Sequence, residues 1–178
     1  SARMITIARG LHPELDFRMD DCAELATIDS AHDDLVIANY VLMDTPDLRG
    51  TMAAFNRVLK PGGVAVLVFS HPCFPPGPAT VSEDGDEVCY RWSFPYFESR
   101  TWSDPPWGHF TSEFIWFHRP LSDYWKAFTV AGFVVVDFEE PRITTERYYL
   151  AKTARGLRNS QTRPYSVAFK LQKKPTPA

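Results

Sequence analysis

The segment Asp34–Phe74 constrains the fold of this 178-residue chain more than any other part of the sequence. It contains two apolar runs, Leu35–Ala38 and Val64–Phe69, separated by a stretch whose apolar residues follow helical spacing. A helix is expected to open near Pro46, and Lys60–Gly63 carries the residues that end one. The second run is apolar on both faces, as in a buried parallel strand. This order of strand, helix and strand predicts half of a doubly wound α/β sheet.

Polar residues follow both predicted strands at the positions where such sheets bind ligands. Asn39 and Tyr40 follow the first strand, and His71 and Cys73 follow the second. Ligands of doubly wound sheets bind beyond the carboxyl ends of the strands. We therefore expect the functional site at this end of the sheet.

Three motifs in this half of the chain closely resemble one family. They are Asn39–Leu42 followed by Pro46-Asp47, the turn Arg57–Gly63 (RVLKPGG), and Arg18–Leu25 (RMDDCAEL). Together they resemble the class I S-adenosylmethionine-dependent methyltransferases, in their small-molecule, type 11-like branch. The resemblance implies a Rossmann-like sheet, and we expect residues 1–178 to form a single domain of this kind.

The resemblance also implies the cofactor, S-adenosylmethionine, and a set of residues that bind it. Asp21 and Cys22 occupy the positions that face the adenine ring, and an aspartate can accept a hydrogen bond from the exocyclic amine. Asn39 and Tyr40 occupy the positions that face the methionine part of the cofactor. The alternative for Asp21 is an ordinary cap at a strand end.

The family's glycine-rich turn, which follows its first strand, has no counterpart in this sequence. Gly10 stands alone, and Gly62-Gly63 belongs to the turn before a later strand. Ser1–Arg9 resembles the helix that follows the second strand of the family, with Met4, Ile7 and Ala8 on its apolar face. We therefore expect the N-terminal strands to be missing and Asp16–Asp20 to be the first strand present.

An aromatic-rich insertion, residues 75–118, follows the fifth strand of the family pattern. All five tryptophans lie from Trp92 to Trp125. We expect strands at Glu87–Phe94 and Glu113–His118, joined by a loop over Trp102–Phe110. The family commonly builds its acceptor-site cover here, although the aromatic residues could instead be only the core of a small subdomain. The candidate substrate-binding residues are Trp102, Trp107, His109, His118 and Arg119.

The last third of the sequence, from Pro120 onward, predicts the remaining helices and strands of the sheet fold. We expect a helix over Pro120–Phe128, a strand over Phe133–Phe138, a short helix over Thr145–Arg155 and a last antiparallel strand over Pro164–Leu171.

Composition excludes several other classes of protein. The net charge of −3 gives no electrostatic reason to expect a nucleic-acid partner, and no apolar run is long enough to span a membrane. The three cysteines are widely spaced, which argues against a disulfide framework and favours a reducing, cytoplasmic setting. The histidines and cysteines form no metal-ligand pattern.

The expected reaction is methyl transfer to oxygen or nitrogen of a small, partly hydrophobic acceptor. A general base is needed only if the acceptor arrives protonated, and His71 is the best-placed candidate because imidazole titrates near neutral pH. His71 could instead be held in a turn by Pro72, and His109 and His118 are weaker candidates for the base.

Two other functions compete with this one. The missing glycine-rich turn motivates a truncated or non-catalytic relative that binds a partner or forms a homodimer. A nicotinamide-dependent enzyme on a similar sheet is disfavoured, because the dinucleotide glycine motif is absent.

Overall fold

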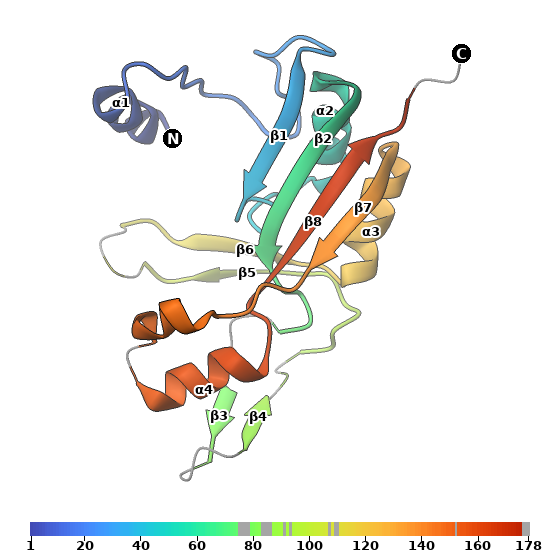
Figure 1. The fold of residues 1–178 in the computed structure, drawn as a ribbon. Coiled ribbons are helices and arrows are strands. Elements are labelled where there is room, and N and C mark those ends of the chain that lie inside the picture. Colours follow the sequence, from blue (N-terminus) through green and yellow to red (C-terminus); the bar gives the residue numbers. More distant parts are fainter. Residues whose placement is uncertain are drawn as a thin grey trace.

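A four-stranded sheet forms the centre of the molecule (Figure 1). The computed structural model describes residues 1–74, 79–82, 87–90, 92, 94–106, 108, 111–151 and 153–175. The strand order is β1-β2-β8-β7, with β1 (Asp33–Asn39) parallel to β2 (Leu59–Ser70). β8 (Ser166–Lys173) pairs antiparallel with β2 on one side and with β7 (Phe133–Glu139) on the other. The α/β class, the two central strands and the antiparallel last strand are confirmed.

The β1–α2–β2 unit forms as expected, except at the start of its helix. α2 (Leu48–Val58) begins after Asp47, whose side chain accepts a hydrogen bond of 2.9 Å from the Gly50 amide. Pro46 therefore lies before the capping residue and not in the first turn of the helix. Asp47 is the better cap, because its carboxylate can accept from a free amide at the helix start and a proline side chain cannot. Gly62 has φ +78°, a conformation that favours glycine, and lies in the irregular first part of β2, where the pairing with β1 shifts from Asp33–Leu59 to Leu35–Val64.

α2 and α3 (Leu121–Val130) bury their apolar faces against one face of the sheet (Figure 1). Phe69 of β2 is fully buried and stacks on Tyr124 of α3 at 4.4 Å and on Phe169 of β8 at 5.9 Å. Phe169 also contacts Phe128, at a ring distance of 5.2 Å. This aromatic stack joins two strands to one helix and lies below the carboxyl ends of β1 and β2.

The opposite face of the sheet is more exposed. Leu35 and Ile37 of β1 are 52% and 66% exposed. α1 (Ala2–Leu11) lies apart from the sheet in Figure 1 and has no buried residue, so the apolar face expected at Met4, Ile7 and Ala8 is not packed in this structure.

The strand expected at Asp16–Asp20 is wrong, since this segment has no regular secondary structure. The carboxylate of Asp20 instead accepts hydrogen bonds from the backbone amides of Asp21, Ala26 and Thr27. A side chain that accepts from three backbone amides holds the chain in a loop, and this loop competes with the extended conformation that a β-strand needs.

The aromatic-rich insertion forms two separate hairpins. β3 (Ala79–Val81) pairs with β4 (Val88–Tyr90), and β5 (Arg100–Asp104) pairs with β6 (Phe114–His118). The strand expected at Glu113–His118 is confirmed. The loop expected over Trp102–Phe110 is wrong at its start, because Trp102 belongs to β5 and pairs with Trp116 of β6. The strand expected at Glu87–Phe94 is shorter than predicted. Parts of the expected strand and loop, including Trp107, His109 and Phe110, lie outside the described residues.

The segment between β7 and β8 holds two short helices rather than one. η1 (Thr145–Leu150) is a 3-10 helix, and α4 (Ala154–Thr162) begins at Thr153, whose hydroxyl accepts a hydrogen bond from the Gly156 amide. Across the described ranges, no helix is long and apolar enough to cross a membrane.

Phe169→Ala tests the aromatic stack. We expect it to lower the free energy of unfolding by about 3–5 kcal/mol, because it removes a buried ring and leaves a cavity. Denaturant unfolding measures the change. Tyr149→Ala is the control, since Tyr149 is 78% exposed and should change stability by no more than about 0.5 kcal/mol. Equal effects of the two variants would contradict the assignment of Phe169 to the core.

Candidate functional site

The parallel pairing of β1 and β2 brings Asn39 and Tyr40 to the same end of the sheet as Ser70 and His71 (Figure 1). The Asn39 side chain is exposed at this end. Tyr40 has φ +53°, which is uncommon for a residue other than glycine and costs of order 1–3 kcal/mol. Its amide donates to the Val68 carbonyl at 2.7 Å, and its hydroxyl hydrogen-bonds the Ser166 hydroxyl. These bonds hold Tyr40 across the ends of β1, β2 and β8.

The loop at Asp20–Thr27 is organised by two aspartates. The Thr27 hydroxyl and amide hydrogen-bond the Asp20 carboxylate and hold its pKa below the ordinary value of 3.8. Asp21 uses one carboxylate oxygen to accept from the Ala23 amide at 2.8 Å, which is a turn contact and not the strand-end cap expected as its alternative, since no strand precedes it. That bond occupies one oxygen of Asp21 and leaves the second for a ligand.

Cys22 connects this loop to the segment that follows β1. Its sulfur lies 3.5 Å from the Thr45 hydroxyl oxygen and 3.8 Å from that of Thr51. Thr45 in turn donates to the carbonyl of Val41, at 3.1 Å. The structure therefore brings Cys22 against the segment between β1 and α2 and the first turn of α2, and its contact with a cofactor stays a prediction.

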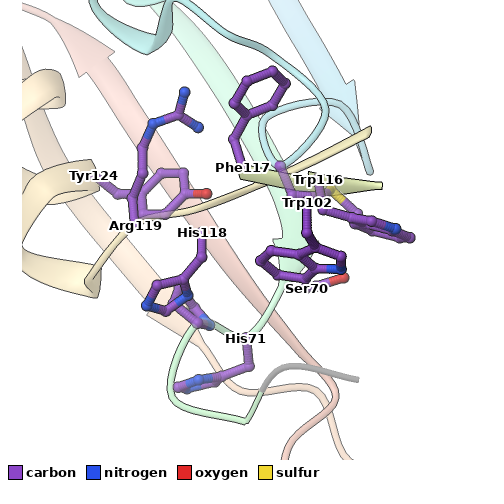
Figure 2. Close-up of a pocket in the computed structure, with 10 residues that line it drawn as sticks. Ser70, His71, Trp102, Trp116, Phe117, His118, Arg119 and Tyr124 are labelled. Carbon is purple, nitrogen blue, oxygen red and sulfur yellow. The ribbon is translucent and has the colours of Figure 1, made fainter. Parts of the chain in front are cut away.

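A small cavity of about 30 Å³ lies at the carboxyl end of β2, between the β5–β6 hairpin and α3 (Figure 2). Four of the predicted site residues gather around it: His71, Trp102, His118 and Arg119. Trp107 and His109 lie outside the described residues. Further lining residues that the sequence reasoning missed are Met43, Ser70, Pro72, Trp116, Phe117 and Tyr124. Trp116 and Phe117 belong to the aromatic-rich insertion and Tyr124 to the expected helix over Pro120–Phe128, but such patterns do not show the direction of a side chain.

His71 is 3% exposed, and both of its ring nitrogens are hydrogen-bonded. Nδ1 accepts from the Cys73 amide at 3.1 Å, and Nε2 lies 2.8 Å from a carboxylate oxygen of Glu140. Because an amide only donates, Nδ1 carries no proton, and the neutral ring donates from Nε2 to Glu140. The turn-holding alternative thus describes the observed contacts, and the predicted base has no free lone pair.

His118 is 5% exposed and is bonded at one nitrogen only. Its Nε2 lies 2.8 Å from the Tyr96 carbonyl oxygen, which only accepts, so Nε2 carries the proton. Among the residues that the structure describes, nothing hydrogen-bonds Nδ1 of this ring. In the neutral form, Nδ1 is therefore an unprotonated nitrogen at the wall of the cavity.

Arg119 holds the loop between β1 and α2. Its guanidinium donates to the carbonyls of Thr45 and Pro46 at 2.6 and 2.8 Å, and lies over the Phe117 ring at 5.3 Å. These bonds satisfy carbonyls that precede α2. The contacts of Arg119 are thus structural, although its side chain also lines the cavity.

Tyr96 joins the insertion to α3, a contact that no sequence motif indicated. Its hydroxyl accepts from the Leu121 amide at 2.8 Å, at a helix start with no other side-chain cap. Burial, together with the Cys73 thiol, raises the pKa of Tyr96 to about 12.

Comparisons with known proteins agree with this fold. A family model described as a methyltransferase domain matches residues 1–67. A demethylmenaquinone methyltransferase from Chlorobaculum tepidum is 35% identical over 68 residues, which are 38% of this chain and 28% of that protein. The match thus spans little more than a quarter of this curated relative.

Two solved structures share the fold over most of the chain. One is a putative S-adenosylmethionine-dependent methyltransferase from Listeria monocytogenes, with TM-score 0.74 and 18% identity over 98% of this chain and 77% of that one. The other is an S-adenosylmethionine-dependent methyltransferase from Mesorhizobium loti, with TM-score 0.76 and 17% identity over 97% of this chain and 77% of that one.

Residues 1–67 thus match the methyltransferase domain, and the chain has the fold of S-adenosylmethionine-dependent methyltransferases. The family resemblance of the sequence motifs is confirmed over the matched residues. The described residues include no group of three histidine, cysteine or acidic side chains arranged to hold a metal ion.

Tyr96→Phe tests the junction of the insertion with α3. We expect the free energy of unfolding to fall by about 1–3 kcal/mol, because the Leu121 amide loses its acceptor. Tyr149→Phe removes an exposed hydroxyl and serves as the control in the same unfolding measurement. A Tyr96 variant as stable as this control would argue against the capping role.

Asp20→Asn tests the organisation of the Asp20–Thr27 loop. A carboxylate whose folded-state pKa is lowered adds stability above its unfolded pKa and loses it as pH falls through the folded pKa. We therefore expect a lower melting temperature for the variant at pH about 7, and a gap that narrows below pH about 4. Asp29→Asn, in the same part of the chain but outside these hydrogen bonds, is the control. A gap that does not change with pH would contradict this account.

Proposed function

We propose that this chain forms part of an S-adenosylmethionine-dependent enzyme that methylates oxygen or nitrogen of a small, partly hydrophobic acceptor. One observation carries the proposal. Cys22 of the Asp20–Thr27 loop contacts Thr45 in the segment that follows β1, and the ends of β1 and β2 lie together beside a cavity lined by aromatic side chains.

The residues present fit the cofactor at this edge. Asn39 offers an exposed amide at the end of β1, and Asp21 retains one carboxylate oxygen beyond its internal hydrogen bond. Cys22 and Tyr40 lie on the two segments that would flank the cofactor, and each is held by hydrogen bonds. These four residues are the proposed binding set.

The bound cofactor would supply an electrophilic methyl group, whose bond to sulfur breaks as an acceptor lone pair forms the new bond. The chain's own contribution is to orient the acceptor and exclude water, which together can supply several kcal/mol of the barrier. Residues 75–118 are proposed to cover the acceptor. Their β5–β6 hairpin supplies Trp102, Trp116 and His118 to the cavity.

The acceptor must displace aromatic side chains to enter. A cavity of about 30 Å³ holds roughly one water molecule. Trp102 and Trp116 are paired across β5 and β6. This hairpin is attached to the segment after β1 by isolated hydrogen bonds, such as the one from the Phe117 amide to the Met43 carbonyl. The relative that acts on demethylmenaquinone is consistent with an apolar ring as acceptor.

The second candidate is a non-catalytic module that associates with another copy of the chain. The exposed apolar residues Leu35 and Ile37 on the open face of the sheet favour it. This candidate predicts self-association without cofactor binding.

Calorimetric titration with S-adenosylmethionine separates the two candidates. We expect saturable binding, and we expect Asn39→Ala to weaken it about five- to tenfold through the loss of one hydrogen bond. Asp34→Ala is the matched control, because Asp34 lies on the same strand but pairs with Lys60 at the other end. Absence of binding, accompanied by dimers in sedimentation, would favour the second candidate instead.

A further inference from the structure

His118 lines the cavity, and one nitrogen of its ring, Nδ1, has no hydrogen-bond partner among the described residues. The residue ends β6, two positions after Trp116, so both side chains leave the strand on the same face. Buried polar groups are normally hydrogen-bonded, so a free acceptor on a ring that is 5% exposed calls for an explanation.

The state of His118 follows from its hydrogen bond to Tyr96. The carbonyl fixes the proton on Nε2, so the lone pair on Nδ1 is ready to accept another. His71, which lines the same cavity, has already used its Nδ1 to accept from the Cys73 amide. The two histidines therefore differ in the one property that a base requires.

The surroundings of His118 suit a cation that forms during the reaction. The rings of Phe94, Tyr96 and Trp92 lie 4.9, 5.7 and 6.3 Å from the imidazole. Aromatic rings within about 6 Å attract cations, and the Phe94 and Tyr96 rings fall in this range.

The charged and titratable groups around His118 come from five places in the fold. Arg100 of β5 pairs with it, Arg119 follows it, and His71 lines the cavity from the end of β2. Tyr124 lines the cavity from α3, and Tyr96, in the segment before β5, supplies the carbonyl contact. Figure 2 shows His118 between His71 and Arg119, with Trp102 beside it.

We propose that His118 is the general base of this methyltransferase, and that its acceptor is an aromatic compound bearing a hydroxyl group. This inference rests on the proposed function. The hydroxyl O–H bond breaks, the proton passes to Nδ1, and the oxygen keeps the electron pair as a phenolate. The imidazolium retains its Nε2–H bond to the Tyr96 carbonyl.

Nitrogen NMR of histidine-labelled protein tests the base without any ligand. We expect His118 to be the Nε2-protonated tautomer at high pH and to gain a proton at Nδ1 as pH falls. Comparison with the spectrum of His118→Gln assigns the signals. A proton on Nδ1 in the neutral ring would overturn the proposal, because the cavity would then face a donor.

Binding of 4-nitrophenol tests the acceptor class, since its ionised form absorbs visible light. We expect wild-type protein to bind it and to raise the ratio of phenolate to phenol. His118→Gln keeps an amide donor for the Tyr96 carbonyl, and we expect it to lower that ratio about tenfold, the effect of one pKa unit. His12→Gln is the control, as His12 is exposed at the end of α1.

The outcomes separate this inference from the proposed function. Neither measurement needs S-adenosylmethionine. If the protein binds the cofactor but does not change the ratio of phenolate to phenol, His118 is not the base, and the methyltransferase proposal still stands. Failure of wild-type protein to bind 4-nitrophenol would overturn the aromatic hydroxyl class. Loss of the shift in His71→Gln but not in His118→Gln would assign the base to His71.

Discussion

The placement of the site depends on β2, which is hydrogen-bonded on both sides. It pairs parallel with β1 and antiparallel with β8, and its buried face carries Leu67 and Phe69. A shift of one residue in either ladder would turn these side chains to the open face. Because the core fixes the register of the two strands, the residues just after β1 and just after β2 lie at the same edge of the sheet. The candidate cofactor residues and the cavity inherit their relative position from this pairing.

A second layer of contacts ties the insertion to that edge. Phe117 donates its amide to the Met43 carbonyl, Arg119 binds carbonyls of the same loop, and the Tyr96 hydroxyl accepts from the start of α3. These are polar contacts at the rim of the core, so they orient the β5–β6 hairpin without burying it. A hairpin held in this way can rearrange more readily than a strand of the main sheet, because fewer buried apolar contacts must break.

Sequence patterns predicted the sheet better than they predicted the site. The β1–α2–β2 unit and β8 followed from apolar periodicity and turn residues, which are local signals. Trp102 was placed in a loop because its partner, Trp116, is distant in sequence, and periodicity does not report such pairing. Asp16–Asp20 failed as a strand because one carboxylate collects three backbone amides. The contrast between His71 and His118 depends on which backbone groups face each ring, which no sequence pattern shows.

The place of β8 has a consequence for the order in which the molecule folds. This strand comes last along the sheet-forming chain, yet it fills the centre of the sheet, pairing Val64 with Gln172 and Phe133 with Lys173. During synthesis, β2 emerges with one edge unpaired, β7 emerges without its partner strand in this sheet, and Phe69 lacks its Phe169 neighbour. Contacts of such long separation slow folding and expose strand edges to other chains. The stable core of this fold therefore forms only after residues near the C-terminus of this sequence have left the ribosome.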